Sequence, residues 1–534
     1  MRPVFLKGQP AVFPAIARTV VVSAVAVLLF LLAGHVWLER HMNNSAILNA
    51  AFLKYLSATA YDPAKIQFAP EYIFLENIYS TLIETDTGGE TVSGLAERFV
   101  WKGPELHFTM RPDLKTVDGR LIDARDAEVS FKRILILNGG THTDLANMLC
   151  AGATLRGIGD ACPGMEVRDN NSVFVLKLKK KNIAVLKMLA AMDLAVIPRG
   201  SLDEKTLAIK DYRNTSGPYY VAEDGQEGRI TLKTNPAHYH YKKNIPQVVN
   251  LVPSGKGGVK ESLELFEAGK VDHVMASDRA MPELLIDYAQ KHPESTNLHV
   301  TTPFKLHMLV FTRKGLARFS EKERFGIGRG LRRIYLEHAM LVPDTEAAEQ
   351  VIPPLADGAL TGEQLAALKS ITDAVPVDAV SPQKILAWNL SIPNLFAADE
   401  AELRKYFPGT RVEISRNIPA FTDFGKEGIE EPDLVFLGID MGFEESIGRM
   451  TYMANAGLFP APGTDLKDWA RRYTSTEEKT SRIQLSRELN YSTLVHAGAI
   501  PLTWSPYAAI IRKPWKMGFS KMYPNSHLWR ISQD

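Results

Sequence analysis

The sequence is poor in cysteine and carries almost no net charge. Only Cys150 and Cys162 occur among its 534 residues. No other soft ligand stands near them, which excludes a cysteine-rich zinc site. The 62 Lys and Arg residues against 61 Asp and Glu residues leave a net charge of +1. Because nucleic-acid-binding proteins need a concentrated positive surface, this balance indicates no nucleic-acid partner.

Sequence motifs typical of enzymes are missing or incomplete. Neither G-x-S-x-G nor H-E-x-x-H occurs. The run Ser254–Gly258 lacks the Gly-Lys-Ser/Thr ending of a phosphate-binding loop. Ser381–Lys384 has S-x-x-K spacing without the downstream S-D-N and K-T-G motifs. His238 and His240 would share one face of a strand, but no third metal ligand is evident nearby. We therefore expect no catalytic residue, metal or cofactor, and predict that the protein is not an enzyme.

One long apolar run lies near the amino terminus. Residues 19–38 (TVVVSAVAVLLFLLAGHVWL) contain no Asp, Glu, Lys or Arg. A helix of that length, at about 1.5 Å per residue, matches the roughly 30 Å hydrocarbon core of a bilayer. Arg2, Lys7 and Arg18 precede the run. This excess of positive charge predicts that residues 1–18 are cytoplasmic and that the rest of the chain lies outside the cytoplasm.

Two interpretations of the apolar run remain open. A cleaved signal peptide needs a processing site. Leu31–Gly34 resembles the start of a lipoprotein signal, but His35 stands where the lipid-bearing cysteine would be, and no convincing A-x-A site follows. The sequence therefore favours an uncleaved transmembrane anchor at residues 19–38. The protein would cross the cytoplasmic (inner) membrane once, with most of its chain facing the periplasm.

The two cysteines enclose a glycine-rich stretch, CAGATLRGIGDAC. Outside the cytoplasm the redox environment permits a disulfide between Cys150 and Cys162. Closing so short a loop stabilises a fold by about 2–3 kcal/mol in the chain-entropy description. We predict this disulfide. The alternative is a pair of unrelated thiols.

Apolar residues alternate between two periods along the chain. Period-two alternation in Glu105–Met110 predicts a strand, and helical spacing in Asp123–Ile136 predicts a helix with an acidic first turn. Other strands are expected at 172–178, 229–233, 306–312, 385–390, 411–414 and 433–437, and other helices at 71–82, 261–268, 281–291, 327–338, 400–406 and within 465–497. Such alternation is typical of α/β or α+β chains with mixed sheets, and the length allows two or three domains.

A series of short motifs follows one order in the first part of the chain. Each motif is weak alone, but the ordered set over residues 61–126 resembles the family 5 extracellular solute-binding proteins. These are the oligopeptide- and dipeptide-binding subunits of ABC importers. The motifs are Tyr61–Pro63, Glu71–Leu82, Gly94–Glu97, Leu106–Arg111, Asp118–Gly119 and Ala124–Asp126.

The resemblance continues to the end of the sequence. Gly217–Tyr220, Leu232–Tyr239, Phe266–Asp272 and Arg512–Trp515 are similar to further motifs of the family, so the likeness spans residues 49–534. It implies a two-lobed fold of the periplasmic-binding-protein kind, with two crossovers between the lobes, preceded here by the transmembrane helix. Lobe I is expected to comprise residues 49–262 and 489–534, and lobe II residues 263–488.

The resemblance also implies a function. The chain would capture a peptide-like or other small polar solute, act as a monomer, and present the solute to an ABC permease in the membrane. Thr312 stands where many family members have asparagine, and Gly330–Glu337 departs from the family's helix, which leaves the ligand class open. The alternative is a membrane-anchored sensor or scaffold that kept the binding fold without transport, which an uncleaved anchor would suit.

Site residues follow from the same resemblance. In the family's peptide-binding members, an aspartate after a strand and a glycine pairs with the ligand's α-ammonium group. Gly438, Ile439 and Asp440 follow the strand expected at 433–437, so Asp440 is the candidate carboxylate. A carboxylate in a water-poor cleft attracts an ammonium group more strongly than it does in water.

A second set of contacts is expected on the opposite lobe and near the C-terminus. Residues 65–71 resemble the segment whose backbone pairs with an extended peptide, a mode of binding that does not depend on the peptide's side chains. The expected contacts are Gln67, Phe68 and Ala69, with Trp504 and Tyr507 lining the pocket.

Overall fold

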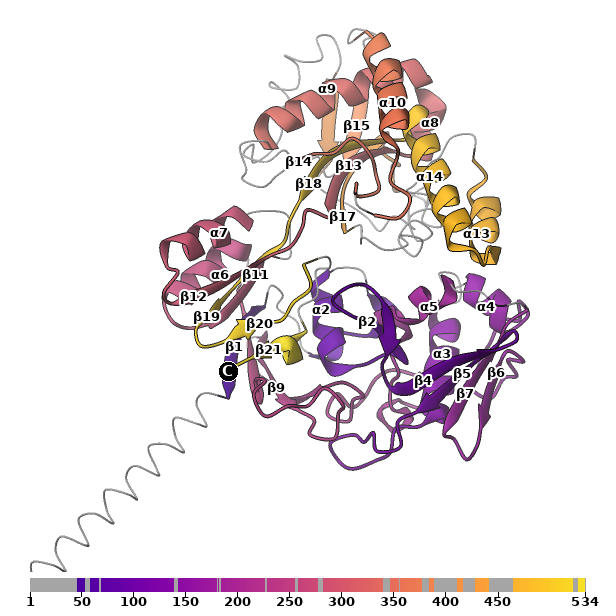
Figure 1. Ribbon diagram of the computed structural model, residues 1–534, viewed down its shortest axis with the longest axis vertical. Coiled ribbons are helices and arrows are strands. Elements are labelled where there is room, and N and C mark those ends of the chain that lie inside the picture. Colours follow the sequence, from indigo (N-terminus) through magenta and orange to yellow (C-terminus); the bar gives the residue numbers. More distant parts are fainter. Residues whose placement is uncertain are drawn as a thin grey trace, which may run out of the picture.

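The structure is a computed structural model. It describes residues 46–52, 58–66, 69–138, 143–179, 181, 184–225, 228–254, 258–276, 282–339, 346–354, 356–376, 384–388, 411–415, 428–440, 464–521 and 527–533. Figure 1 shows two bodies, one above the other, which we call lobe I and lobe II.

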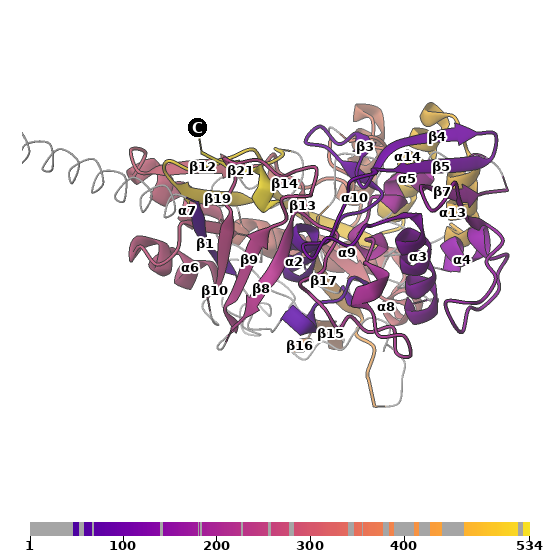
Figure 2. The same cartoon turned by 90° about the horizontal axis from the view of Figure 1, so that it is seen from below.

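Lobe I contains a seven-stranded sheet in the order β12-β19-β11-β1-β10-β9-β8. β1 pairs in parallel with β10 and β11, and β19 pairs antiparallel with β11 and β12. Figure 2 shows β1, β10, β9 and β8 side by side. The strands are β1 (Ile47–Phe52), β8 (Tyr219–Asp224), β9 (Ile230–Thr234), β10 (Val248–Pro253), β11 (His273–Ala276), β12 (Thr296–Val300) and β19 (Ala508–Arg512).

Helices cover both faces of this sheet. Alternate residues of β1, namely Leu48, Ala50 and Phe52, point into a core shared with helix α2 (Ala69–Ile78). Such alternation is expected of a strand, whose successive side chains point to opposite faces. Side chains of the other face pack against α6 (Gly258–Glu267) and α7 (Pro282–Lys291).

A four-stranded sheet, in the order β4-β5-β7-β6, forms the other half of lobe I. Its apolar side chains form one core with those of α3, α4 and α5. The elements are β4 (Ala96–Lys102), β5 (Glu105–Met110), α3 (Ala124–Asn138), α4 (Thr143–Leu149), β6 (Met165–Arg168), β7 (Val173–Lys177) and α5 (Ala184–Leu189). Two short pairs complete lobe I: β2 (Ile83–Thr85) with β3 (Thr91–Ser93), and β20 (Lys516–Met517) with β21 (Ile531–Ser532).

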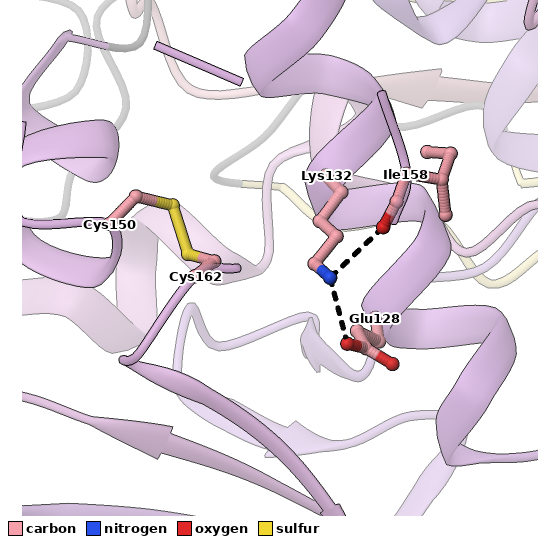
Figure 3. Close-up of a disulfide and its surroundings, with 5 residues drawn as sticks. All are labelled: Glu128, Lys132, Cys150, Ile158 and Cys162. Atoms are coloured by element: carbon pink, nitrogen blue, oxygen red, sulfur yellow. Dashed lines mark hydrogen bonds and ion pairs between the residues drawn. A yellow bond between two sulfur atoms is a disulfide. The ribbon is translucent and has the colours of Figure 1, made fainter. Parts of the chain in front are cut away.

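A disulfide joins Cys150 to Cys162 beside this sheet, as the sequence predicted, with the two Cα atoms 4.4 Å apart. A second interaction, made by Lys132, also holds the loop that the disulfide closes (Figure 3). The buried Lys132 ammonium on α3 donates to the Ile158 carbonyl at 3.0 Å and pairs with Glu128 at 3.1 Å. The glycine-rich loop is therefore fixed both by a covalent bond and by a lysine of the neighbouring helix.

Lobe II is built on a six-stranded sheet in the order β14-β18-β13-β17-β15-β16. β13 lies between β17 and β18 and runs antiparallel to both. Its side chains alternate between two cores, with Leu306, Met308 and Val310 in one and Leu309 and Phe311 in the other. The strands are β13 (Lys305–Phe311), β14 (Glu346–Ala347), β15 (Lys384–Trp388), β16 (Arg411–Ser415), β17 (Leu434–Asp440) and β18 (Ala499–Ser505).

Helices surround this second sheet, as Figure 1 shows for α9, α10, α13 and α14. The first core contains side chains of α10, α13 and α14, and the second contains side chains of α9. The described helices of lobe II are α8 (Arg313–Arg318), α9 (Glu321–Ala339), α10 (Gly362–Ala374), α13 (Leu466–Ser475) and α14 (Lys479–Val495). Among the residues that the structure describes, no helix is both long and apolar enough to cross a membrane. The anchor expected at 19–38 lies outside them.

Within the residues that the structure describes, the chain passes between the lobes twice, through residues 301–304 after β12 and through residues 506–507 after β18. This differs from the boundaries expected at 262/263 and 488/489. β11 and β12 belong to the sheet of lobe I because they pair with β1 and β19, and β18 belongs to lobe II because it pairs with β13. Two crossovers are present, as expected, but at different residues.

Candidate functional site

Most of the expected site residues of lobe II gather at the first residues of β13. Gly438, Ile439 and Asp440 pair with His307, Leu306 and Lys305, in that order. On the other side of β13, Trp504 pairs with Leu306 and Ser505 with Lys305. Three strands thus bring these positions together next to the two connections between the lobes.

His307 on β13 is paired with Gly438 on β17 and with Thr503 on β18. We call such a set of paired positions across the three strands a polar row, and His307 is the centre of this one. Its Nδ1 lies 3.2 Å from the Thr503 hydroxyl, and its ring stacks on Phe436 with centroids 5.7 Å apart. Burial, and second the charge of Lys305, lower the pKa of His307 to about 3. The imidazole is therefore neutral near pH 7 and offers hydrogen bonds without a charge.

The next row begins at Lys305, whose ammonium nitrogen lies 5.2 Å from the centroid of the Tyr507 ring. Tyr507 stacks in turn on Phe304, with centroids 5.3 Å apart. A cation at this distance from an aromatic face is attracted by the ring's quadrupole. The connection at 301–304 and the connection at 506–507 are thus joined by aromatic contact where the site residues meet.

Trp504 and Tyr507 are both buried, and they pack in the same core of lobe II. Trp504 is 2% exposed. Its indole N–H has no hydrogen-bond partner among the residues that the structure describes. A buried donor without a partner carries a free-energy cost. Trp504 pairs with Leu306, so its ring lies on the opposite face of the sheet from His307. Both aromatic rings form part of the packed interior of lobe II.

Asp440 occupies a different kind of position from the one expected. The sequence indicated that the strand ends at Leu437 and that Asp440 lies in the following loop. Instead, β17 continues to Asp440 because its pairing with β13 extends to Lys305. Paired positions share one face of a sheet, so a lysine is the cross-strand neighbour of the candidate aspartate.

The segment expected to pair with an extended peptide has extended backbone at Ile66 but belongs to helical elements on either side of the gap in the described residues. Lys65 ends a 3₁₀ turn (Pro63–Lys65), and Ala69 is the first residue of α2. Pro70 in the first turn suits a helix start, because its missing N–H would have no partner there. Gln67 and Phe68 lie outside the described residues.

Several residues that carry the family resemblance have structural roles. Asp62 accepts a hydrogen bond from the Ala64 N–H at 2.8 Å and pairs with the buried Arg133 guanidinium at 2.6 Å. Asp126 is fully buried and pairs with Arg120 at 2.5 Å, and it accepts the backbone N–H of Arg199 at 2.8 Å. These motifs fix turns and helix starts in lobe I.

His238 and His240 lie in a turn, where a strand had been considered, and each has its own partner. The Nε2 atom of His238 lies 3.2 Å from the Ser80 hydroxyl, and that of His240 lies 2.9 Å from a carboxylate oxygen of Glu84. His240 also stacks on Trp529, with ring centroids 3.6 Å apart. Within the described part of the chain, no group of three His, Cys, Asp or Glu side chains could hold a metal ion.

Sequence reasoning missed Lys305 and His307. Both alternate with apolar residues at the start of an otherwise apolar strand, KLHMLVF. That pattern marks one face of the strand as polar at its first residues. It gave no indication that the neighbours of these residues would be Gly438 and Asp440, because strand pairing joins positions more than 130 residues apart (440 − 305 = 135).

The fold is similar to those of solved solute-binding proteins. OppA of Haemophilus influenzae, in complex with the peptide RPPGFSPFR, superposes with a TM-score of 0.70 at 14% identity, covering 91% of this chain and 99% of that one. The murein tripeptide binding protein MppA of Escherichia coli gives 0.67 at 17% identity, covering 91% and 98%. NikA of Brucella suis, in complex with Fe(III)-EDTA, gives 0.69 at 15% identity, covering 91% and 100%.

Neither a protein-family model nor a curated protein matches the sequence. The likeness is therefore one of architecture, and it extends over nearly the whole of each compared chain. This protein has the two-lobed mixed α/β fold of those solute-binding proteins.

Proposed function

We propose that this protein is an extracytoplasmic solute-binding protein that captures a peptide-like or other small polar solute for an ABC importer. The observation that carries the proposal is the likeness in fold to OppA and MppA, which covers 99% and 98% of those chains. A chain that keeps both lobes and both crossovers keeps the parts that hinge closure around a ligand requires.

The polar rows on β13 support a ligand site at the junction of the lobes. Lys305, His307 and Thr503 supply a cation, a neutral imidazole and a hydroxyl within two successive rows, with Asp440 as the cross-strand partner of Lys305. A few polar groups beside an apolar surface are typical of small-molecule sites. The proposed role of Asp440 is to pair with an ammonium group of the solute.

Native mass spectrometry of the purified full-length chain tests this function. The expected result is a mass excess that disappears on denaturation and releases a small polar solute. If the protein is purified empty, a tryptic digest of casein serves as the probe, and ligand-dependent thermal stabilisation is expected, since binding to the folded state alone stabilises it. The absence of both a bound solute and any stabilisation would argue against the proposal.

Membrane attachment belongs to the same proposal. The charge-free run at 19–38, with cationic residues before it, supports an uncleaved helix in the inner membrane and a periplasmic location for both lobes. Amino-terminal sequencing of the mature protein should then begin near Met1. A mature terminus between residues 35 and 46 would instead indicate a cleaved signal.

A further inference from the structure

A short segment after β20 touches both the body of lobe I and a connection between the lobes. We call residues 518–521 the clasp. The Ser520 hydroxyl donates to the Thr87 carbonyl at 2.7 Å. The Lys521 carbonyl accepts the backbone N–H of Thr302 at 2.8 Å and its hydroxyl at 2.7 Å. Thr302 belongs to the connection at 301–304, so the clasp restrains that connection directly.

The restrained connection is itself bonded to the second one. The backbone N–H of Thr301 donates to the Tyr507 carbonyl at 3.0 Å, and the N–H of Tyr507 donates to the Thr301 hydroxyl at 2.8 Å. Hydrogen bonds at this point therefore hold both passages of the chain between the lobes. Loosening the clasp would free the connections that a hinge motion has to bend.

Two histidines hold the clasp in place. The Phe519 ring packs edge-on against His273, with centroids 6.0 Å apart, and edge-on against His299, with centroids 5.6 Å apart. The two histidines lie on β11 and β12, on either side of β19. The Nε2 atom of His299 also lies 2.9 Å from the Ser520 carbonyl, to which it donates.

His273 is sealed by this packing. It is 4% exposed, and its Nε2 has no hydrogen-bond partner among the described residues. Phe519 is buried against it. An imidazolium in this position would be a buried charge without a partner, which costs far more free energy than a neutral ring.

The charged groups around the two histidines also disfavour protonation. His273 faces His299, and His299 faces the Lys521 ammonium. Directly before His273 in the sequence, the Asp272 carboxylate is engaged elsewhere. It accepts hydrogen bonds from the backbone N–H and the side chain of Asn49, and it lies 3.7 Å from Arg512. The charges that act on His273 and His299 are therefore those of Lys521 and of the other imidazole when it is protonated. They are positive and oppose the uptake of a proton.

Burial lowers the pKa of His273 from 6.5 to about 4, with the charge of His299 second. Burial also lowers the pKa of His299, against the hydrogen bond to Ser520, which raises it. Both rings take up a proton more readily once they are exposed to water. The docked clasp is thus stable above pH 6.5, and its stability falls as the pH drops from 6.5 towards 4.

We propose that the clasp is an acid-released restraint on the connections between the lobes, opened when His273 and His299 are protonated. The arrangement of Phe519 between the buried His273 and the partly buried His299, at a segment bonded to Thr302, carries this inference. It does not depend on which solute binds, or on whether one binds. Protonation of buried histidines is a general means of opening a packed contact below pH 6.5.

Hydrogen–deuterium exchange of the full-length chain at pH 7.5 and pH 5.5 tests the proposal. After correction for intrinsic exchange, peptides covering residues 299–304 and 516–521 should lose protection at pH 5.5. A pKa of 6.5 in the open state and about 4 in the docked state predicts about tenfold more opening from His273 alone. Unchanged protection at pH 5.5 would overturn the proposal.

Variants separate the clasp from general acid sensitivity. In the double variant His273→Gln and His299→Gln the pH dependence of these peptides should disappear, whereas His292→Gln, a change on the exposed surface, should keep it. If the double variant does not fold, ¹³C-labelled histidine spectra of the wild type decide. Titration of His273 near pH 6.5 with the clasp still protected would contradict the proposal, and so would a double variant that retains the full pH response.

Discussion

Gly438 lies directly opposite His307 in the pairing of β17 with β13. A Cβ atom at position 438 would come 3.1 Å from His307 Cδ2 and 3.4 Å from His307 Nε2. The glycine therefore leaves the space in which the imidazole lies across the strand. In a site built from a few polar groups, the direction of this imidazole decides which atoms a ligand can meet.

Gly438→Ala should weaken solute binding more than it weakens the fold. The added methyl group crowds His307, whose ring must shift by a few tenths of an ångström to make room, and this shift changes the direction in which the imidazole meets a ligand. Position 438 is exposed, so the midpoint of unfolding should change little. Calorimetry with the solute released from the purified protein would measure the loss of affinity.

Gly362→Ala provides the matched control, because a Cβ there meets no atom within 4 Å. It lies at the start of α10, where alanine suits a helix better than glycine. An equal loss of affinity in both variants would show that the loss does not come from the contact between position 438 and His307.

The local spacing of apolar residues was sufficient to predict many of the helices and strands. The strand expected at Glu105–Met110 is β5 with the same bounds, and the helix expected at Asp123–Ile136 is α3, within two residues at each end. Most of the buried apolar side chains of each lie in one core, so its own sequence contains the signal. The helix expected at 400–406 lies outside the described residues.

Pairing between distant strands could not be predicted in the same way. Gly438 indicated a strand end, yet hydrogen bonding to β13 carries β17 on to Asp440. The glycine that begins the motif Gly217–Tyr220 is also required by a contact with a residue distant in the sequence. A Cβ at Gly217 would lie 2.3 Å from the Ile78 carbonyl carbon, so the close approach of α2 requires glycine there. Motif spacing locates such residues without revealing what they contact.

Removal of the Cys150–Cys162 disulfide should destabilise lobe I without preventing its folding. The double variant Cys150→Ala and Cys162→Ala is expected to lose about 2–3 kcal/mol of unfolding free energy, since the closed loop is short. Lys132 still holds that loop through the Ile158 carbonyl. Chemical denaturation with and without reductant measures the effect. The wild type should shift with reductant and the alanine variant should not, and labelling of both thiols in the unreduced, denatured wild type would contradict the bond.

Arg133→Met should be among the most damaging single changes in lobe I. It leaves the Asp62 carboxylate buried without its partner, and breaking a buried pair costs about 3–5 kcal/mol. Lys369→Met, which breaks an exposed pair with Asp373 on α10, should cost about 0.3–0.5 kcal/mol. Denaturation midpoints compare the two. The addition of Asp62→Asn to Arg133→Met should restore part of the loss, and no recovery would place the damage elsewhere.

Asp440→Ala tests the proposed ammonium contact most directly. Leaving a ligand's charge unmatched in a desolvated site should cost about 2–5 kcal/mol of binding free energy. Lys305 occupies the position paired with Asp440, and opposite charges at paired positions attract, so we expect Lys305 to compete with the ligand for the carboxylate. Lys305→Met is therefore expected to keep or raise the affinity for a solute with a free amino group, and N-acetylation of that solute should reduce the difference between the wild type and Asp440→Ala. Asp373→Ala, an exposed helix position of the same lobe, serves as the control. Calorimetry in which Asp440→Ala binds as tightly as the control would move the ammonium contact to another residue.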